Sequence, residues 1–244
     1  MPDARMHRGA DPQDAKLFAA SSIPQLLAAT SDLCWLYDRG YSPVSALKLV
    51  GDRYALTKRQ RAALLRCACA EARAVARRAR RVSCEQVADA CLCIDGFNVL
   101  TTLEVALSGG VVLIGRDGCA RDIAGVHGSY RQVEETGPAL ELLARLIVAL
   151  RVRACEWLLD QPVSNSGRLC ARIRAYAAEH DLPWQARVVS DPDFVLAHCS
   201  EIVATADGAV LDQAARSFNL ARLCIETSVA GAFVVNLSGE TSAC

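Results

Sequence analysis

The first third of the chain places apolar residues at helical spacing and shows no strand pattern. The pair Ser42-Pro43 is typical of a helix start, because the hydroxyl can accept an unpaired backbone N–H and proline suits the first turn. Thr57 and Gln60 form a capping-box pattern ahead of a third helix, which we expect to run without a break over residues 57–81. The pattern therefore predicts a small all-α domain over residues 1–85.

After residue 83, short apolar runs alternate with amphipathic helical stretches. This alternation is typical of a mostly parallel sheet with helices on both faces, so we predict an α/β, Rossmannoid domain over residues 86–244. The expected strands are 91–94, 111–114, 154–159, 186–189, 201–204, 221–225 and 232–237. The expected helices between them include 137–150, 167–179, 193–198 and 209–218.

The segment 108–131 fits this alternation less well. It predicts a strand, a turn at Asp117-Gly118 and a glycine-containing loop, which we interpret as an inserted hairpin or flap. It could be a lid that contacts phosphate, or a solvated loop whose charges have no special role. The charged side chains of this segment are Arg116, Asp117, Arg121, Asp122, His127 and Arg131.

Composition narrows the class of protein. Of the 244 residues, 52% are hydrophobic, which is enough for a sizeable core. The chain has no apolar run long enough to span a membrane and no signal-peptide pattern, so we expect a cytoplasmic protein that makes no membrane contact. Its twelve cysteines lie mostly in apolar runs and lack Cys-x-x-Cys pairs, which favours buried, reduced thiols over disulfides or a zinc site.

Charge is balanced over the whole chain, with 27 basic and 27 acidic residues, but it is unevenly distributed. The stretch 71–81 carries five arginines and one glutamate; the arginines are Arg73, Arg77, Arg78, Arg80 and Arg81. Two interpretations stay open. Arginine is a good former of solvated helices, whereas so basic a run also attracts phosphates, in which case the helical domain binds nucleic acid or another partner.

Four acids lie where predicted strands end. Asp95, Asp160 and Asp207 each follow a strand, and Asp193 opens the helix after the strand that ends at Asp191. Ligands of open parallel sheets bind beyond the carboxyl ends of the strands, so we expect these side chains at one edge. Each acid alone is also explained as a helix cap. Together they would repel one another unless a cation neutralised them, which favours a Mg²⁺ or Mn²⁺ site.

The residues around these acids resemble the NYN domain, a branch of the PIN-like nuclease superfamily. The segment Ile94-Asp95-Gly96-Phe97-Asn98-Val99 is similar to its first-strand motif, in which the Asp binds metal and the Asn orients the loop or the substrate. The segments 158–167, 191–197 and 205–208 look like the second, third and fourth acidic positions. The third ligand could be Asp191 or Asp193, and we choose Asp193 because it opens the helix.

The resemblance covers about residues 90–237, and the N-terminal part resembles a prokaryotic family that joins a helical domain of unknown function to a PIN-like domain. It implies a metal-dependent endoribonuclease that acts on RNA. The metal-binding and catalytic residues would be Asp95, Asp160, Asp193 and Asp207, with Mg²⁺ or Mn²⁺ as cofactor. The substrate-binding residues would be Asn98, Ser164, Asn165, Thr205, Arg121, Arg77 and Arg78.

Two other functions stay open. One is a non-catalytic PIN-like module that binds nucleic acid or protein. The other is a metal-dependent phosphatase, although an aspartyl-phosphate enzyme would need an aspartate where this chain has Phe97. A dinucleotide-binding domain is disfavoured because the G-x-G-x-x-G loop is missing after the first strand. The oligomeric state stays open as well, a homo-oligomer included.

Overall fold

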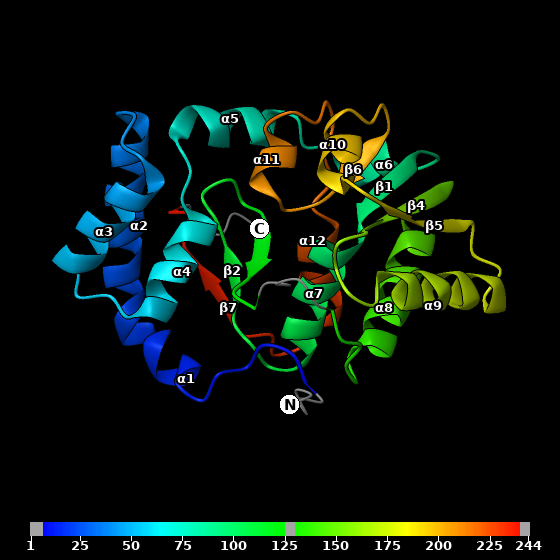
Figure 1. Cartoon of the computed structure of the whole chain (residues 1–244), viewed down its shortest axis with the longest axis horizontal. Helices are drawn as coiled ribbons and strands as arrows, with labels where there is room; N and C mark the ends of the chain where they lie inside the picture. Colours follow the sequence, from blue (N-terminus) through cyan, green and yellow to red (C-terminus); the bar gives the residue numbers. More distant parts are fainter. Residues whose placement is uncertain (1–6, 125–129, 240–244) are drawn as a thin grey trace.

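The computed structural model describes residues 7–124 and 130–239 (Figure 1). Its helices are α1 (Asp14–Leu17), the 3₁₀ helix η1 (Ala20–Ser22), α2 (Ile23–Asp38), α3 (Pro43–Arg53), α4 (Lys58–Cys67), α5 (Glu71–Ala79), α6 (Cys84–Val87), α7 (Gly96–Leu107), α8 (Thr136–Ala149), α9 (Ser166–Glu179), α10 (Pro192–Ala197), α11 (Gly208–Leu211) and α12 (Leu220–Ser228). Its strands are β1 (Cys91–Asp95), β2 (Val112–Ile114), β3 (Ala120–Asp122), β4 (Ala154–Asp160), β5 (Trp184–Val189), β6 (Ile202–Ala204) and β7 (Val234–Asn236).

The helical start of the chain agrees with its predicted caps. The Ser42 hydroxyl accepts the backbone N–H of Ser45, and Thr57 and Gln60 form the capping box of α4. The prediction of one continuous helix over residues 57–81 is wrong. The backbone turns extended at Ala68, and the chain restarts as α5, which carries the arginines away from the axis of α4.

Four strands form a parallel sheet in the order β5-β4-β1-β6, which confirms the α/β prediction. One face packs against α7, α8, α9 and α12, and the other packs against α10 and α11. The chain leaves β1 toward the first face and leaves β6 toward the second, so β1 and β6 flank the point where the winding direction changes. In sheets of this kind, that point is where ligands bind.

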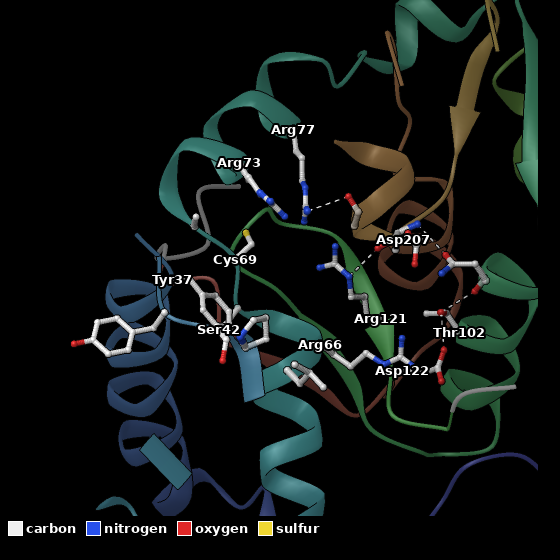
Figure 2. A pocket seen from close by; sticks show the side chains of 18 of the residues that line it. Tyr37, Ser42, Arg66, Cys69, Arg73, Arg77, Thr102, Arg121, Asp122 and Asp207 are labelled. Atoms are coloured by element: carbon white, nitrogen blue, oxygen red, sulfur yellow. Dashed lines mark hydrogen bonds between the residues drawn. The ribbon is translucent and has the colours of Figure 1, made fainter. Parts of the chain in front are cut away.

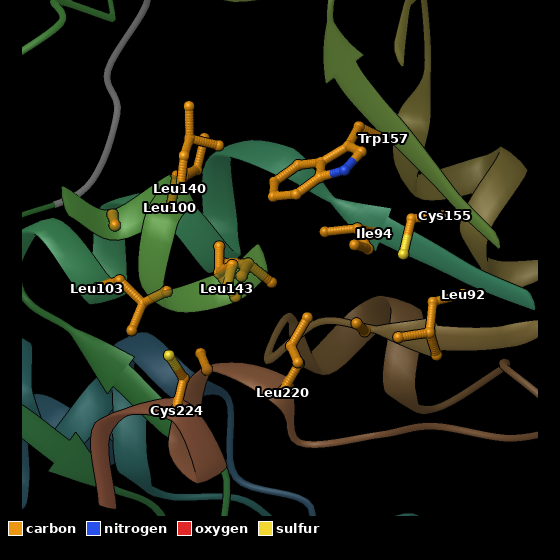
Figure 3. Packing of buried hydrophobic residues seen from close by; sticks show 14 of the residues in the cluster. Leu92, Ile94, Leu100, Leu103, Leu140, Leu143, Cys155, Trp157, Leu220 and Cys224 are labelled. Atoms are coloured by element: carbon orange, nitrogen blue, oxygen red, sulfur yellow. The ribbon is translucent and has the colours of Figure 1, made fainter. Parts of the chain in front are cut away.

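The larger core lies on the first face. Trp157, Leu100 and Leu143 are fully buried there, between the sheet and the helices that cover it (Figure 3). The predicted strand 221–225 is wrong, because this segment is part of α12. Its buried residues Leu220, Ala221, Cys224 and Ile225 recur at helical rather than alternating spacing. The predicted helix 209–218 is also shorter than expected, since α11 ends at Leu211.

A second, three-stranded sheet in the order β3-β2-β7 separates the helical region from the rest (Figure 1). Leu113 and Val235 pack with Leu33 and Leu64 of the helical region, whereas Val112 joins the larger core. The strands expected at 111–114 and 232–237 therefore exist, but in this small sheet. Because β7 comes from the end of the chain, the helical region completes its core with residues distant in sequence.

The expected flap is a buried hairpin over the part that the structure describes. Strands β2 and β3 pair antiparallel, as a hairpin requires. Asp117, Arg121 and Asp122 are buried, so the interpretation of a solvated loop is wrong for them. His127 lies outside the described residues.

None of the described helices is long and apolar enough to cross a membrane. The eleven cysteines in residues 7–124 and 130–239 are all free thiols, and eight of them are buried. Burial raises the pKa of Cys67 and of Cys155 to about 12, so both thiols stay protonated near neutral pH. This agrees with the interpretation of cysteines as small apolar residues.

Candidate functional site

Asp95 is the last residue of β1 and the N-cap of α7, and it lies beside the winding reversal. Its carboxylate accepts hydrogen bonds from the Thr205 hydroxyl at 2.7 Å and from the Asn98 backbone N–H at 3.3 Å. Burial nevertheless raises the pKa of Asp95 to about 7, and the negative charges of Asp193 and Asp207 add to that rise. The site thus contains a carboxyl group that is ionised only in part at neutral pH.

Gly96 makes this position of Asp95 possible. A Cβ atom at residue 96 would lie 2.6 Å from Leu159 Cδ2 and 3.0 Å from the Leu158 carbonyl oxygen. Only a residue without a side chain lets α7 start this close to the neighbouring strand β4. The Asp-Gly pair of the sequence motif therefore has a packing reason, whatever its chemical role.

The loop after β6 is tied to the loop after β1 by side-chain bridges. The Asn98 side-chain oxygen accepts the Ala206 N–H at 2.8 Å, and the Thr205 hydroxyl accepts the Asp207 N–H at 3.0 Å while it donates to Asp95. Asn98 and Thr205, two of the predicted substrate-binding residues, therefore hold the acidic loops in place. Asp207 itself caps α11, because its carboxylate accepts the N–H groups of Ala209 and Val210.

The two other predicted acids lie at the same edge of the sheet. Burial raises the pKa of Asp193, and so do the nearby charges of Asp207, Asp191 and Asp160. The pKa of Asp160 is raised by burial and then by Asp191. Asp193 is therefore within electrostatic reach of the acids that follow β4 and β6. Asp191 caps α10 by accepting the Phe194 N–H at 2.9 Å, which leaves Asp193 as the less engaged of the two.

Only oxygen ligands are offered at this edge, which suits a hard divalent cation such as Mg²⁺ or Mn²⁺. Within residues 7–124 and 130–239, no three His, Cys, Asp or Glu side chains are close enough together to hold one metal ion. The edge is therefore not a closed protein cage. A magnesium ion does not need one, since it usually binds through one or two carboxylates and keeps several waters. The raised pKa of Asp95 fits such an ion, because a nearby cation would stabilise the ionised carboxylate against its burial, which is the main cause of the rise, and against the charges of Asp193 and Asp207.

A network of buried arginines lies next to the acidic loops. The Asp117 carboxylate is fully buried and accepts hydrogen bonds from Arg77 at 2.8 Å and from Arg121 at 2.6 and 2.7 Å. Arg77 also donates to Asp212 at 2.7 Å and to the Gly208 carbonyl at 3.0 Å, while Arg121 donates to the Ala206 carbonyl at 2.8 Å. The network joins α5 of the helical region to the loop that carries Asp207 (Figure 2).

The remaining predicted substrate-binding residues lie apart from this network or serve other contacts. Arg78 donates to the Arg116 carbonyl and to Glu71. Ser164 and Asn165 are exposed in the loop after β4, and the Asn165 side chain donates to the Tyr130 carbonyl at 2.9 Å. Their part in substrate binding stays a prediction, as it does for Arg77 and Arg121.

A cavity of about 620 Å³ opens between the helical region and the acidic loops (Figure 2). Its helical wall includes Tyr37, Tyr41, Arg66 and Arg73, and its opposite wall includes Asn98, Thr102, Arg121, Asp122 and Asp207. Sequence patterns did not single out Tyr37 or Arg66. A lone tyrosine or arginine on an amphipathic helix carries no signal of its own, because only the packing of two distant segments turns it toward a cavity.

The fold and this edge define a class of α/β proteins whose acids gather at the winding reversal of a parallel sheet. The chain belongs to the family described as a domain of unknown function (DUF5616), whose model matches residues 84–223. A second family, described as a protein of unknown function (DUF434), matches residues 25–80. The chain is also similar to Uncharacterized protein MJ0935 of Methanocaldococcus jannaschii, with 28% identity over 183 residues, which are 75% of this chain and 87% of that protein. No solved structure matches the chain.

Proposed function

We propose that the protein is a metal-dependent endoribonuclease that hydrolyses RNA phosphodiesters at the acidic edge around Asp95. The observation that carries the proposal is the position and the raised pKa of the Asp95 carboxyl group. This partly buried carboxyl group lies where ligands bind in such sheets, is surrounded by other acids, and has a pKa raised to about 7. The resemblance of residues 94–99 to the NYN motif supports the same function.

The acids would bind the metal, and Thr205 and Asn98 would position them. One or two of the carboxylates of Asp95, Asp160, Asp193 and Asp207 would bind Mg²⁺ or Mn²⁺ directly, and the others would contact the waters that the ion keeps. A bound ion supplies a water of lowered pKa and stabilises charge on the leaving oxygen. Thr205 would keep the Asp95 carboxylate oriented, since its hydroxyl donates at 2.7 Å. Asn98 would hold the loop after β6 at a constant distance from Asp95 through its bond to Ala206 N.

A second candidate is a binding module of the same fold without catalysis. It is favoured by the capping bonds of Asp207 and Asp191, which occupy both carboxylates in helix starts. In that case the acids would serve the fold, and the cavity beside them would be the functional feature.

The test is cleavage of a mixed RNA pool with Mn²⁺, Mg²⁺ or a chelator, for the wild type and for Asp95→Asn. We expect wild-type cleavage that depends on the metal, and a loss of about 100-fold or more in the variant, because a direct ligand matters more than the outer contacts that already cost 10- to 100-fold. Asp181→Asn is the matched control, since Asp181 is exposed and has a positive φ that asparagine tolerates. If the wild type binds RNA but does not cleave it in the presence of any divalent metal, the binding module is favoured. Hydrolysis of a small phosphoester instead of RNA would favour a phosphatase.

A further inference from the structure

The helical wall of the cavity carries an arginine without a counter-ion. Arg66 lies near the end of α4, is exposed, and forms no hydrogen bond or ion pair with any residue that the structure describes. Its side chain extends across the cavity toward β3 (Figure 2). A cation held over a cavity in this way is available to an anion from outside the chain.

Arg73 adds a second cation from α5. Its side chain points down into the same space, and its ion pair is a contact of 3.2 Å with Asp212 at a side-chain exposure of 66%. So exposed a pair contributes little and can be exchanged for another anion. Arg77 and Arg121 differ, because both are buried and both form ion pairs with Asp117, while Arg77 also pairs with Asp212. Among the described residues that line the cavity, Arg66 has no ion pair and Arg73 has an exposed one that a ligand can replace, so these two arginines are the ones available to an anion.

The wall beside these arginines is aromatic. Tyr41 is half exposed at the rim, and Tyr37 lines the interior. The Tyr37 hydroxyl oxygen is buried and has no hydrogen-bond partner in the described part of the chain, so a ligand in the cavity would contact the ring of Tyr37 and not its hydroxyl group. Tyrosine rings provide stacking surfaces for bases whatever the sequence.

The size of the cavity limits what can enter. A volume of about 620 Å³ lies in the range of pockets for small ligands, so it suits one or two nucleotides and not a double helix. Gly40, with φ +78°, ends α2 and turns the chain into the 40–43 rim of this cavity. The helical region thereby closes one side of a space whose other side is the acidic edge.

We propose that this cavity binds an unpaired nucleotide segment of single-stranded nucleic acid, with phosphate on Arg66 and Arg73 and a base against the tyrosine wall. The helical region would then be the substrate-selecting part of the molecule. Asp207 and Asn98 line the opposite wall, so a strand seated here continues directly to the acids. The role of the cavity as a substrate site rests on the proposed nuclease function, whereas binding itself can be measured without cleavage.

The experiment measures fluorescence anisotropy of a labelled single-stranded RNA in a chelator, at several salt concentrations. Arg66→Gln should weaken binding about 10-fold or more, because one charge-assisted contact is worth roughly 1.5–3 kcal/mol. It should also reduce the log–log salt slope by about 0.7, the value for one phosphate contact on a single strand. Lys58→Gln is the matched control. It removes the same charge from an exposed position of the same helix, outside the cavity, and should leave affinity nearly unchanged.

Three further arms separate the outcomes. A duplex of the same sequence should bind more weakly than the single strand, and a free nucleoside 5′-monophosphate should displace the strand only at much higher concentration. Asp181→Asn, which changes an exposed acid outside the cavity, should bind like the wild type. Equal binding by Arg66→Gln and Lys58→Gln, preference for the duplex, tight binding of the mononucleotide alone, or no binding by the wild type would each overturn the proposal. If Arg66→Gln alone loses affinity and no protein cleaves, the cavity assignment stands and the nuclease function fails.

Discussion

The carboxyl groups of Asp117, which is fully buried, and of Asp95, which is partly buried, have surroundings that shift their pKa values in opposite directions. Two arginines hold the pKa of Asp117 well below its usual range despite complete burial. Asp95 has no cationic partner in the described residues and is surrounded by acids, so burial and repulsion raise its pKa to about 7. A buried charge whose partners lie within the chain belongs to the fold, whereas one without such partners points to a ligand from outside.

The same comparison separates the arginines. Arg77 and Arg121 donate hydrogen bonds to Asp117, and they also donate to the carbonyl groups of Gly208 and Ala206, respectively. They fix the loop that carries Asp207 against α5. Arg66, which lies in the preceding helix α4, has no such partner among the described residues. Partners that lie far away in the chain, and not the local frequency of arginine, distinguish a structural cation from a binding one.

The largest expected effect concerns Asp117. Asp117→Asn should lower the free energy of unfolding by about 3–5 kcal/mol, because two buried guanidinium groups lose their counter-charge. Urea unfolding at pH 7 measures it, with Asp181→Asn as a control that should stay near the wild type. Since the folded-state pKa of Asp117 lies below the unfolded value of about 3.9, its stabilisation is complete above that pH and is lost as the pH falls further. If Asp117→Asn has the same free energy of unfolding as the wild type, Asp117 does not stabilise the fold.

The next effect is the response to a cation. Mn²⁺ at about 100 times its dissociation constant should add about 2.7 kcal/mol to wild-type stability. Asp160→Asn should abolish this gain without loss of stability in the absence of metal, because the Asp160 carboxylate accepts no hydrogen bond from the residues that the structure describes. Thermal unfolding with and without Mn²⁺ measures both. A strongly destabilised variant that still responds to Mn²⁺ would instead favour a purely structural role for the acids.

The smallest expected effect is the gain from removing the charge of Asp95. At pH 8 without metal, Asp95→Asn should raise the free energy of unfolding by about 2 kcal/mol, a part of what a rise of three pKa units represents. The pKa of Asp95 is raised on folding, so the wild type loses stability as the pH increases from about 4 through 7. The difference between the two proteins should therefore disappear near pH 4. A variant less stable than the wild type at pH 8 would show that the bond from Thr205 outweighs the buried charge.

Local patterns predicted much of the fold and the place of the acids. Short apolar runs that each end in an aspartate mark β1, β4 and the strand before Asp207, because period and punctuation are local properties of the chain. The same rules failed for α12, because the apolar run 221–225 has the length of a strand but belongs to the buried face of a helix. Over so short a segment, both periods fit the sequence, and only the neighbours decide.

The sequence by itself determined the order of helices and strands, the caps of α3 and α4, and the gathering of acids at the carboxyl ends of parallel strands. Only the tertiary structure decided which charges are neutralised. In the sequence, Asp117 has the pattern of an ordinary turn residue. In the structure, it pairs with Arg77, 40 residues before it, and with Arg121, four residues after it. Arg66 faces a cavity because the opposite wall, which includes Asn98 and Asp207, comes from segments later in the chain. Counter-charges and cavity walls come from contacts distant in sequence, and local patterns carry no information about them.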